Sequence, residues 1–406
     1  MAVIQRLHLS FILYSNNSCT EKKKILKVFY RILVSILIIL VLDFIAGFVI
    51  IPESYHSFRT SHYYYHHGLI PNQSALGAWG SLVYPVHTNS LGFMDSTVNK
   101  VPLKSANKRL LILGDSHSEG VGVPYLKTFS GRLAKELKDE GVDVLNASCI
   151  SYSPKIEYLK LKYLIEKEDF IPDYIFQLID ISDIQNELVY ENYNPEENFS
   201  RLKGLKQQAG IFLNSHSSIY YLVNSIIKAR ERESFIERAE FFDQTREGSG
   251  NNNTLALYSE FFSHFDDNTL LSNPRFHGVG EWYYDDEFRI LADKGIESGL
   301  NYVEKIKELC DEHGIDLTIS VHPWHPQIYL GDPDDYYVRK WRSFAEEKGI
   351  SFVNLFPLFV NEQNPVLIKD MYYIRGDNHW NEFGHEKVSA SLLEFFRKKI
   401  NEDPEL

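Results

Sequence analysis

A long apolar stretch near the N-terminus precedes a chain in which short apolar runs alternate with amphipathic segments. Residues 32–51, ILVSILIILVLDFIAGFVII, contain a single charged side chain, Asp43. About twenty helical residues are enough to cross the hydrocarbon layer of a bilayer. We therefore expect a transmembrane anchor over 32–51, preceded by a short N-terminal segment, 1–31.

Basic residues gather on the N-terminal side of this stretch, and Arg59 is the first basic residue after it. The members of the basic group are Lys22, Lys23, Lys24, Lys27 and Arg31. Because Lys and Arg near a span stay on the cytoplasmic side, we expect a cytoplasmic segment 1–31 and an exported body, periplasmic or extracellular. Asp43 is costly in a lone span and can mark a membrane partner.

Two alternatives to an uncleaved anchor fit this sequence less well. A cleaved signal peptide would have a shorter apolar region and a small-residue cleavage site, which this sequence lacks. A buried core helix would carry polar residues along one face. The uncleaved anchor is the favoured interpretation.

From residue 109 onward, apolar runs and amphipathic segments alternate along the chain. Strands are expected at 109–114, 142–148, 174–180, 316–323 and 351–359. Helices are expected at 128–141, 154–170, 300–314, 336–349 and 384–400. This alternation predicts an α/β domain over 106–400, with a parallel, doubly wound sheet covered by helices on both faces.

Two segments do not keep the alternation. Residues 52–105 are rich in turn signals and aromatic side chains, and we expect an irregular extension laid against the main domain. Residues 184–298 contain a helical-looking stretch and the polar tract GSGNNNT. We expect this segment to be an insertion that forms a helical cap with a flexible loop.

Composition narrows the class of protein further. The chain has 406 residues and a net charge of −13, which disfavours a nucleic-acid partner. Its three cysteines, Cys19, Cys149 and Cys310, form neither a disulfide framework nor a zinc pattern. With Cys19 on the cytoplasmic side, only a bridge between Cys149 and Cys310 would be available, and nothing in the sequence demands it.

The first expected strand runs into LLILGDSHSEG, residues 110–120, which places Ser116 at its carboxyl end. Ligands bind at this edge of an open parallel sheet, and a serine nucleophile there needs a base. RGDNHWNEFGH, residues 375–385, offers one, since Asp377 can orient the imidazole of His379 from two residues away. Either motif alone is also common in turns and helix caps. Their joint placement favours catalysis.

GDSHSEG and GDNHWNEFGH resemble the first and last sequence blocks of the SGNH/GDSL hydrolase superfamily. The Asp-x-His-Trp-Asn form of the last block is similar to that of membrane-linked polysaccharide O-acetyltransferases. The resemblance covers 109–183 and 299–400. It implies a three-layer α/β/α fold, with Ser116 as nucleophile, His379 as base and Asp377 as the residue that orients this base. For this reaction we expect that no metal or organic cofactor is required.

The resemblance also implies an oxyanion hole, with the backbone N–H of Ser116 as one donor. Where the family carries a glycine in its second block, NASCISYSP places Ser151. Where the family carries an asparagine in its third block, DISDI places Ser182. A serine hydroxyl reaches less far than an amide, and loss of one donor typically costs about a hundred- to a thousand-fold in rate.

Several further residues are expected to shape the substrate pocket. They are His117, His322, Trp324, His325, Gln327 and Trp380. For Trp380, packing beneath the last helix is the simpler interpretation. A metal site at His322 and His325 is disfavoured, because the two prolines of VHPWHPQ leave no helical register for paired ligands.

The sequence therefore favours a membrane-anchored serine hydrolase that acts on ester-linked acyl groups, with an acylated surface glycan or related envelope ester as substrate. Acyl transfer to a polysaccharide hydroxyl, through the same three residues, is the first alternative. A non-catalytic glycan-binding or scaffold protein is the second.

Overall fold

The computed structural model describes most of the chain. The described residues are 2–51, 58–79, 82–195, 209–210, 212–213, 216–223, 226, 289–360, 364–375 and 377–402. They divide into two compact units, and each is treated by itself. One comprises Met1–Pro52 with Phe212–Ile226, and the other comprises Glu53–Ile211 with Ile227–Leu406.

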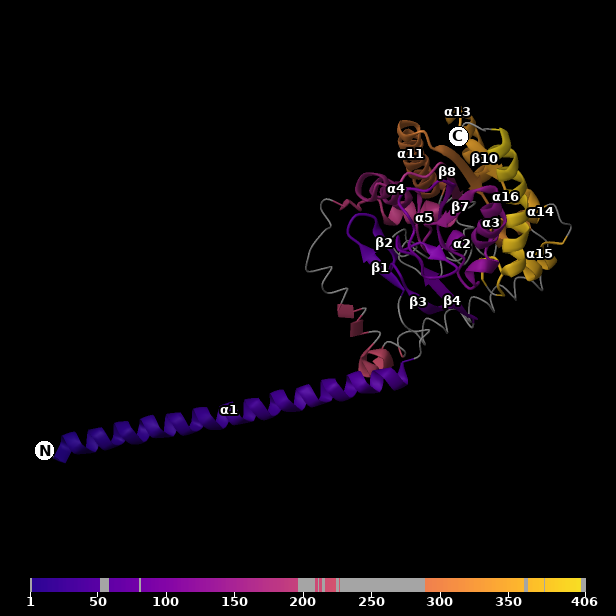
Figure 1. Cartoon of the computed structure of the whole chain (residues 1–406). Helices are drawn as coiled ribbons and strands as arrows, with labels where there is room; N and C mark the ends of the chain where they lie inside the picture. Colours follow the sequence, from indigo (N-terminus) through magenta and orange to yellow (C-terminus); the bar gives the residue numbers. More distant parts are fainter. Residues whose placement is uncertain are drawn as a thin grey trace. The chain divides into compact units, whose positions relative to one another are not determined.

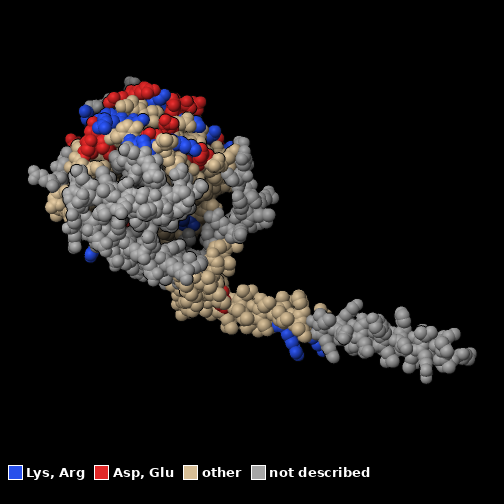
Figure 2. All heavy atoms as spheres, turned by 180° about the vertical axis from the view of Figure 1, so that it is seen from behind, with Lys and Arg blue, Asp and Glu red and all other residues tan. Residues whose placement is uncertain are grey.

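The first unit is built on a single long helix, α1 (Ala2–Ile50). Its part Leu26–Ile50 is long and apolar enough to cross a membrane, although a signal sequence can share these properties. The large apolar side chains of this part are mostly exposed, and Figure 2 shows an almost uncharged surface with basic groups toward the N-terminal end. The apolar helix thus begins six residues before the expected anchor, 32–51.

The second unit is centred on a sheet of five parallel strands. In chain order they are β6 (Lys108–Gly114), β7 (Val142–Asn146), β8 (Tyr174–Ile179), β9 (Asp316–Val321) and β10 (Ser351–Asn354). Their spatial order is β7-β6-β8-β9-β10, and all neighbouring pairs are parallel. The order therefore reverses between β6 and β8, which is where open α/β sheets bind their ligands.

Helices cover both faces of this sheet (Figure 1). On one face lie α3 (Phe129–Leu137) and α16 (Glu382–Glu402), and on the other lie α4 (Pro154–Glu168), α5 (Ser182–Val189) and α11 (Arg289–His313). The remaining helices are α2 (Ser116–Glu119), α12 (His325–Leu330), α13 (Tyr336–Lys348), α14 (Phe356–Val360) and α15 (Pro365–Tyr372). The expected three-layer, doubly wound α/β fold is confirmed.

The burial of the central strand β6 explains why the sequence predicts it. Leu110, Leu111, Ile112 and Leu113 of β6 are all at most 1% exposed. Because helices cover both faces, a central parallel strand is apolar at consecutive positions rather than at alternate ones. The apolar run that predicted this strand is the direct result of that burial.

Residues 52–105 differ from the expected irregular extension, because five short strands form within them. β1 (Arg59–His62) and β2 (His66–Leu69) make a separate hairpin. β3 (Ser74–Trp79), β4 (Leu82–Thr88) and β5 (Met94–Asp95) continue the main sheet in antiparallel fashion beyond β7. The strands were missed because SALGAW and LVYPVHT include Ala, Gly and Pro, which are poor strand formers.

The expected insertion, 184–298, is only partly described. Most of α5 and the start of α11 lie inside these bounds, whereas 227–288 falls outside the described residues. The cap that we expected there consequently stays a prediction. Cys149 and Cys310 are both buried as free thiols, so the bridge between them that the sequence left open is not formed.

Candidate active site

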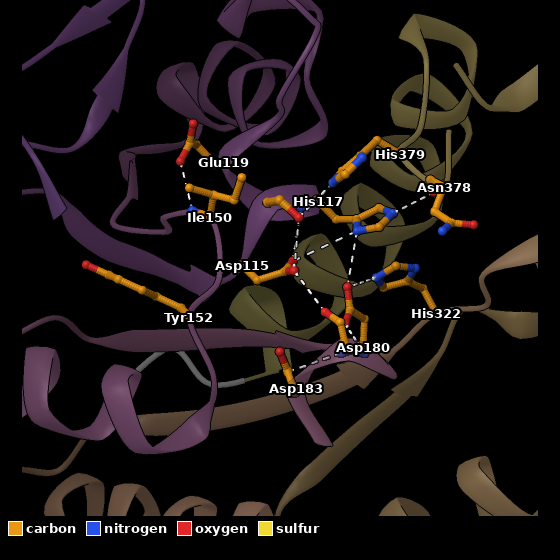
Figure 3. A network of polar contacts seen from close by, with 12 residues as sticks. Asp115, His117, Glu119, Ile150, Tyr152, Asp180, Asp183, His322, Asn378 and His379 are labelled. Atoms are coloured by element: carbon orange, nitrogen blue, oxygen red, sulfur yellow. Dashed lines mark hydrogen bonds and ion pairs between the residues drawn. The ribbon is translucent and has the colours of Figure 1, made fainter. Parts of the chain in front are cut away.

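Ser116 lies where the order of the parallel strands reverses. It follows β6 by two residues, while Asp180 and Ser182 follow β8, the strand on the other side of the reversal. The segment Asp377–His379 lies just before α16 and reaches the same place. The expected motifs are therefore brought together at the carboxyl edge of the sheet (Figure 3).

The turn that presents Ser116 is locally specified. Asp115 caps the short helix α2, since its Oδ1 accepts a hydrogen bond of 3.0 Å from the backbone N–H of His117. Gly114 precedes it with φ = +152°, and a Cβ there would lie 2.3 Å from Oγ of Ser118. Only glycine fits at 114, which accounts for the Gly-Asp-Ser order of the motif.

Ser116, His379 and Asp377 form a continuous chain of contacts. His379 Nε2 lies 2.7 Å from Ser116 Oγ, and His379 Nδ1 contacts Asp377 Oδ1. The same Asp377 oxygen accepts the backbone N–H of His379 at 2.9 Å. Because the carboxylate can only accept, Nδ1 carries the proton and Nε2 is free to take the proton of the serine. This arrangement is the one that nucleophilic acyl chemistry requires.

The electrostatics of the pair match this assignment. Burial works against ionisation of Asp377, but the charge of His379 and hydrogen bonds from His379 and Trp79 outweigh it and hold the pKa of Asp377 below its usual range. Burial also opposes a charge on His379, yet Asp377 raises the pKa of His379 above the ordinary histidine value. The carboxylate thus stays ionised while the imidazole gains basicity.

Trp79, at the end of β3, joins this group although no sequence motif indicates it. Its Nε1 donates a hydrogen bond of 3.0 Å to Asp377 Oδ2, the oxygen that His379 does not use. Its ring meets the ring of His379 edge-on, with centroids 5.0 Å apart. The extension that we expected to be irregular therefore helps to orient the carboxylate of Asp377.

Ser151, in the loop after β7, has φ = +62°, the left-handed conformation that glycine adopts most readily. The serine thus keeps the backbone form that the family's glycine would have. Among the described residues, the N–H groups of Ser116 and Ser151 donate to no other group. Both are free for an oxyanion, as the resemblance implies.

An ion pair from the extension holds the Ser151 loop. Arg59 of β1 pairs with Glu119, whose side chain is almost completely buried and whose Oε2 accepts the N–H of Ile150 at 2.9 Å. On the other side, Tyr190 donates its hydroxyl to the carbonyl of Ser151 at 3.0 Å. The backbone around Ser151 is fixed from two directions.

Ser182 differs from its expected role as a third oxyanion donor. Its Oγ lies 2.6 Å from Asp180 Oδ1, and its backbone N–H donates to the same oxygen at 2.7 Å. The next acceptor, Asp115 Oδ2, is 3.5 Å away. Because a hydroxyl has one hydrogen, and Asp180 takes it, Ser182 does not offer a donor to an acyl oxygen in this structure.

The expected pocket residues lie behind the triad and not on an open surface. His117, His322, Trp324, Gln327 and Trp380 are each at most 3% exposed. Trp380 stacks on Phe359, as packing beneath the last helix predicts. Apolar and aromatic side chains surround and bury these residues. Their side chains therefore do not form the accessible surface of a substrate pocket. The side chain of His325 is outside the described part of the structure.

Two of these buried side chains, together with Asp180, form a cluster of possible metal ligands. His117, Asp180 and His322 place one ligand atom each within 4.8 Å of one another. However, Asp180 already accepts from Ser182 through Oδ1, and its Oδ2 accepts Trp324 Nε1 at 3.2 Å and faces His117 Nδ1 at 3.2 Å. Asp180 is therefore already a hydrogen-bond hub, whereas Nδ1 of His117 and both ring nitrogens of His322 have no hydrogen-bond partner among the described residues.

His117 connects this hub to the triad. Its Nε2 donates to the backbone carbonyl of Asn378 at 3.0 Å, and its Nδ1 faces Asp180. Because the carbonyl can only accept, Nε2 carries the one proton of the neutral imidazole, and burial lowers the pKa of His117 below the ordinary histidine value. His117 thereby fixes the backbone of the residue next to His379, and acts on His379 through its position.

Asp115 lies beside the nucleophile, with Oδ2 3.0 Å from Ser116 Oγ. Burial and the negative charge of Asp180 raise the pKa of Asp115 to about 8. At neutral pH this side chain is mainly a neutral acid. The Ser116 hydroxyl can donate its one hydrogen either to Asp115 Oδ2 or to His379 Nε2.

Comparison with known proteins gives low similarity. No protein-family model and no characterised protein sequence matches the chain. A Bacillus subtilis protein, YxiM, has 12% identity and a TM-score of 0.37, over 73% of this chain and 58% of its own. The acetyl xylan esterase AlAXEase has 11% identity and a TM-score of 0.36, over 70% and 98%. A GDSL-like lipase from Bacteroides thetaiotaomicron has 10% identity and a TM-score of 0.34, over 74% and 93%. At these values the likenesses alone assign neither a fold nor an activity to this chain.

Proposed function

We propose that this protein is a serine-dependent hydrolase of ester-linked acyl groups. The observation that carries the proposal is the 2.7 Å contact between His379 Nε2 and Ser116 Oγ, with Asp377 on the other imidazole nitrogen. The free N–H groups of Ser116 and Ser151 support it, since acyl transfer develops negative charge on the carbonyl oxygen.

In the reaction, Ser116 Oγ attacks the acyl carbonyl carbon as its proton passes to His379 Nε2. The N–H groups of Ser116 and Ser151 bind the resulting oxyanion. When the tetrahedral intermediate collapses, the proton moves from His379 to the departing alkoxide, and an acyl ester remains on Ser116. Water then attacks this ester with His379 as base, which releases the carboxylic acid and restores the serine.

We further propose that α1 is an uncleaved anchor, with the N-terminus in the cytoplasm and the catalytic unit outside. The basic residues before the apolar part support this orientation. An anchored, exported esterase acts on the esters that the cell surface presents, so an acylated surface glycan or related envelope ester is the proposed substrate. An acceptor sugar in place of water would make the same intermediate a transferase.

The decisive test of catalysis is a fluorophosphonate probe, which labels activated serines. We expect labelling of the wild type and none of Ser116→Ala. Ser118→Ala is the matched control, because its hydroxyl lies two residues away on the same short helix and has no hydrogen-bond partner among the described residues. Unlabelled wild type with a normal melting curve would instead support the non-catalytic binding protein. Release of free acid against transfer to an added sugar separates hydrolysis from acyl transfer.

The orientation has its own test. Protease added to intact spheroplasts should digest the catalytic unit and leave a small N-terminal fragment. Full protection of residues 60–406 would contradict an exported body.

A further inference from the structure

The apolar part of α1 carries an acid well inside its length. Asp43 lies seven residues before Ile50, the last residue of the apolar stretch Leu26–Ile50. At 1.5 Å per residue this is about 10 Å from the end of the helix. If the stretch crosses a bilayer, as we proposed, Asp43 lies at the depth of the lipid chains, where an unpaired carboxylate is costly.

The structure supplies a partner for Asp43 from the same unit. Asp43 Oδ1 accepts a hydrogen bond of 2.6 Å from Ser218 Oγ and one of 2.8 Å from the backbone N–H of Ile219. Residues 218–223 are helical, so these donors belong to the first turn of a short helix. Asp43 thus caps a helix that lies about 175 residues further along the chain.

Close packing accompanies this cap. A Cβ on Gly47 would lie 2.1 Å from the backbone oxygen of His216, so only glycine lets the two backbones approach this closely. One turn away, the ring of Phe44 stacks on the rings of His216, at 5.5 Å, and Phe212, at 6.2 Å. Small residues at the point of closest approach are typical of helix contacts in membranes.

The rest of this segment exposes large apolar side chains. These are Phe212, Leu213, Ile219, Leu222, Val223 and Ile226, all between 41% and 66% exposed. The sequence also carries no Asp, Glu, Lys or Arg between Lys206 and Lys228. Such a surface is unfavourable in water, and the apolar part of α1, which this segment contacts, is exposed in the same way.

We propose that the segment Phe212–Ile226 enters the lipid layer beside the anchor and is held there by the contact of Ser218 and Ile219 with Asp43. The inference rests on the proposed membrane anchor. The segment is uncharged but interrupted at Ser217, so it enters the layer and returns without crossing it. The insertion between α5 and α11 is in this way tied to the membrane in the middle of its length.

The test adds one cysteine at a time to full-length protein in proteoliposomes, in a Cys19→Ser background in which the two remaining cysteines, Cys149 and Cys310, are buried. Leu222→Cys should react with a membrane-impermeant maleimide at least tenfold more slowly than Leu126→Cys, a 61% exposed site of the catalytic unit. Detergent should abolish this difference. Equal rates before detergent would overturn the inference.

Ile38→Cys, in the middle of the apolar stretch, tests the proposed anchor separately from the second segment. If Ile38→Cys also reacts quickly, the anchor itself is wrong. If only Leu222→Cys reacts quickly, the anchor stands and the second segment does not.

A bimane label on Leu222→Cys then identifies what covers the segment. Lipids with a nitroxide on the acyl chain should quench it. Protection without quenching would mean that protein, such as a second copy of this chain, covers the segment, and would overturn the proposal.

The role of Asp43 is tested separately. Asp43→Leu should speed maleimide labelling of Leu222→Cys at least tenfold, whereas Asp43→Asn, which keeps an acceptor oxygen, should change the labelling rate little. Unchanged labelling in Asp43→Leu would exclude the role of Asp43.

Discussion

The two sides of Ser116 are built in different ways. On the base side, His379 and Asp377 are two residues apart in sequence, and each side-chain polar atom of the pair has a partner in the structure. On the oxyanion side, the N–H groups of Ser116 and Ser151 are left without partners among the described residues, and the third expected donor, Ser182, is turned to Asp180. The base is complete before substrate arrives, whereas the oxyanion hole depends on how firmly a loop is held.

The two sides also differ in the contacts that they receive from distant parts of the chain. The base side adds one contact, from Trp79, to a pair that a short motif already positions. The oxyanion side needs Arg59 and Glu119 to fix the loop that carries Ser151. On the base side, we therefore expect activity to depend mainly on the reacting groups themselves. On the oxyanion side, we expect it to depend mainly on the residues that hold the Ser151 loop.

The largest effect is expected on the base side. Ser116→Ala and His379→Ala should each lower kcat on a small aryl ester by about 10⁴-fold or more, and the double variant should be little worse than either. The reason is that both residues act in one proton transfer. Steady-state rates with a melting curve for each variant check this. Wild-type turnover in Ser116→Ala would refute the assignment of the nucleophile.

The next effect tests support of the oxyanion loop. Glu119→Gln puts an amide where Arg59 and the N–H of Ile150 both need an acceptor, so the loop should loosen and kcat should fall up to about a hundredfold. Glu136→Gln removes a surface ion pair with Arg397 and is the matched control. Similar kcat values for the two variants would mean that Glu119 does not support the site.

Trp79→Phe sharpens the comparison, because it removes the hydrogen bond to Asp377 and keeps an aromatic ring beside His379. A hydrogen bond to a charged group contributes about 1.5–3 kcal/mol, so we expect kcat to fall about tenfold. KM should not change, since Trp79 orients the carboxylate and does not hold the ester. An equal rise in KM with constant kcat would instead place Trp79 in substrate binding.

Which site residues the sequence could predict depends on how far apart the contacting residues lie along the chain. Ser116 and the pair Asp377 and His379 were predictable because acyl chemistry needs these residue types in short, local patterns. Trp79 and Arg59 were not, because their partners are 298 and 60 residues away and their strands are short.

The same distinction holds for the fold. The buried parallel strands were predicted from apolar runs, which covering helices on both faces impose. The antiparallel strands β3 and β4 were not predicted. Only some of their residues are buried, and apolar and polar residues do not alternate along SALGAW and LVYPVHT. The role expected of Ser182 failed for a local reason, since Asp180, two residues earlier, accepts its hydroxyl.

Asp115→Asn tests the charge between the two sides. The pKa of Asp115 rises from 3.8 to about 8, so the wild type places a new negative charge beside Ser116 as pH passes 8. This charge opposes the oxyanion, and kcat/KM should fall about tenfold per pH unit above the pKa. Asparagine keeps the cap of α2 and stays neutral, so this alkaline decline should disappear.

Stability gives an independent reading of the same group. Because the folded pKa lies above the unfolded value, the wild type loses stability as pH rises from about 4 to about 8. Asp115→Asn should therefore raise Tm more at pH 8 than at pH 5. An identical pH–rate profile and an identical Tm difference at both pH values would show that Asp115 does not titrate in this pH range and would contradict a pKa of about 8.

The smallest effect is expected for Ser182→Ala. If Ser182 donated to the oxyanion, its loss would cost about a hundred- to a thousand-fold in kcat. Its hydroxyl is instead 2.6 Å from Asp180, which keeps contacts from the Ser182 N–H, Trp324 and His117. We expect kcat to fall only about two- to threefold, with a loss of stability of about 1 kcal/mol from the missing hydrogen bond. A hundredfold fall in kcat without a change in Tm would show that Ser182 turns toward the acyl oxygen when substrate binds, and the two sides of Ser116 would then both be complete.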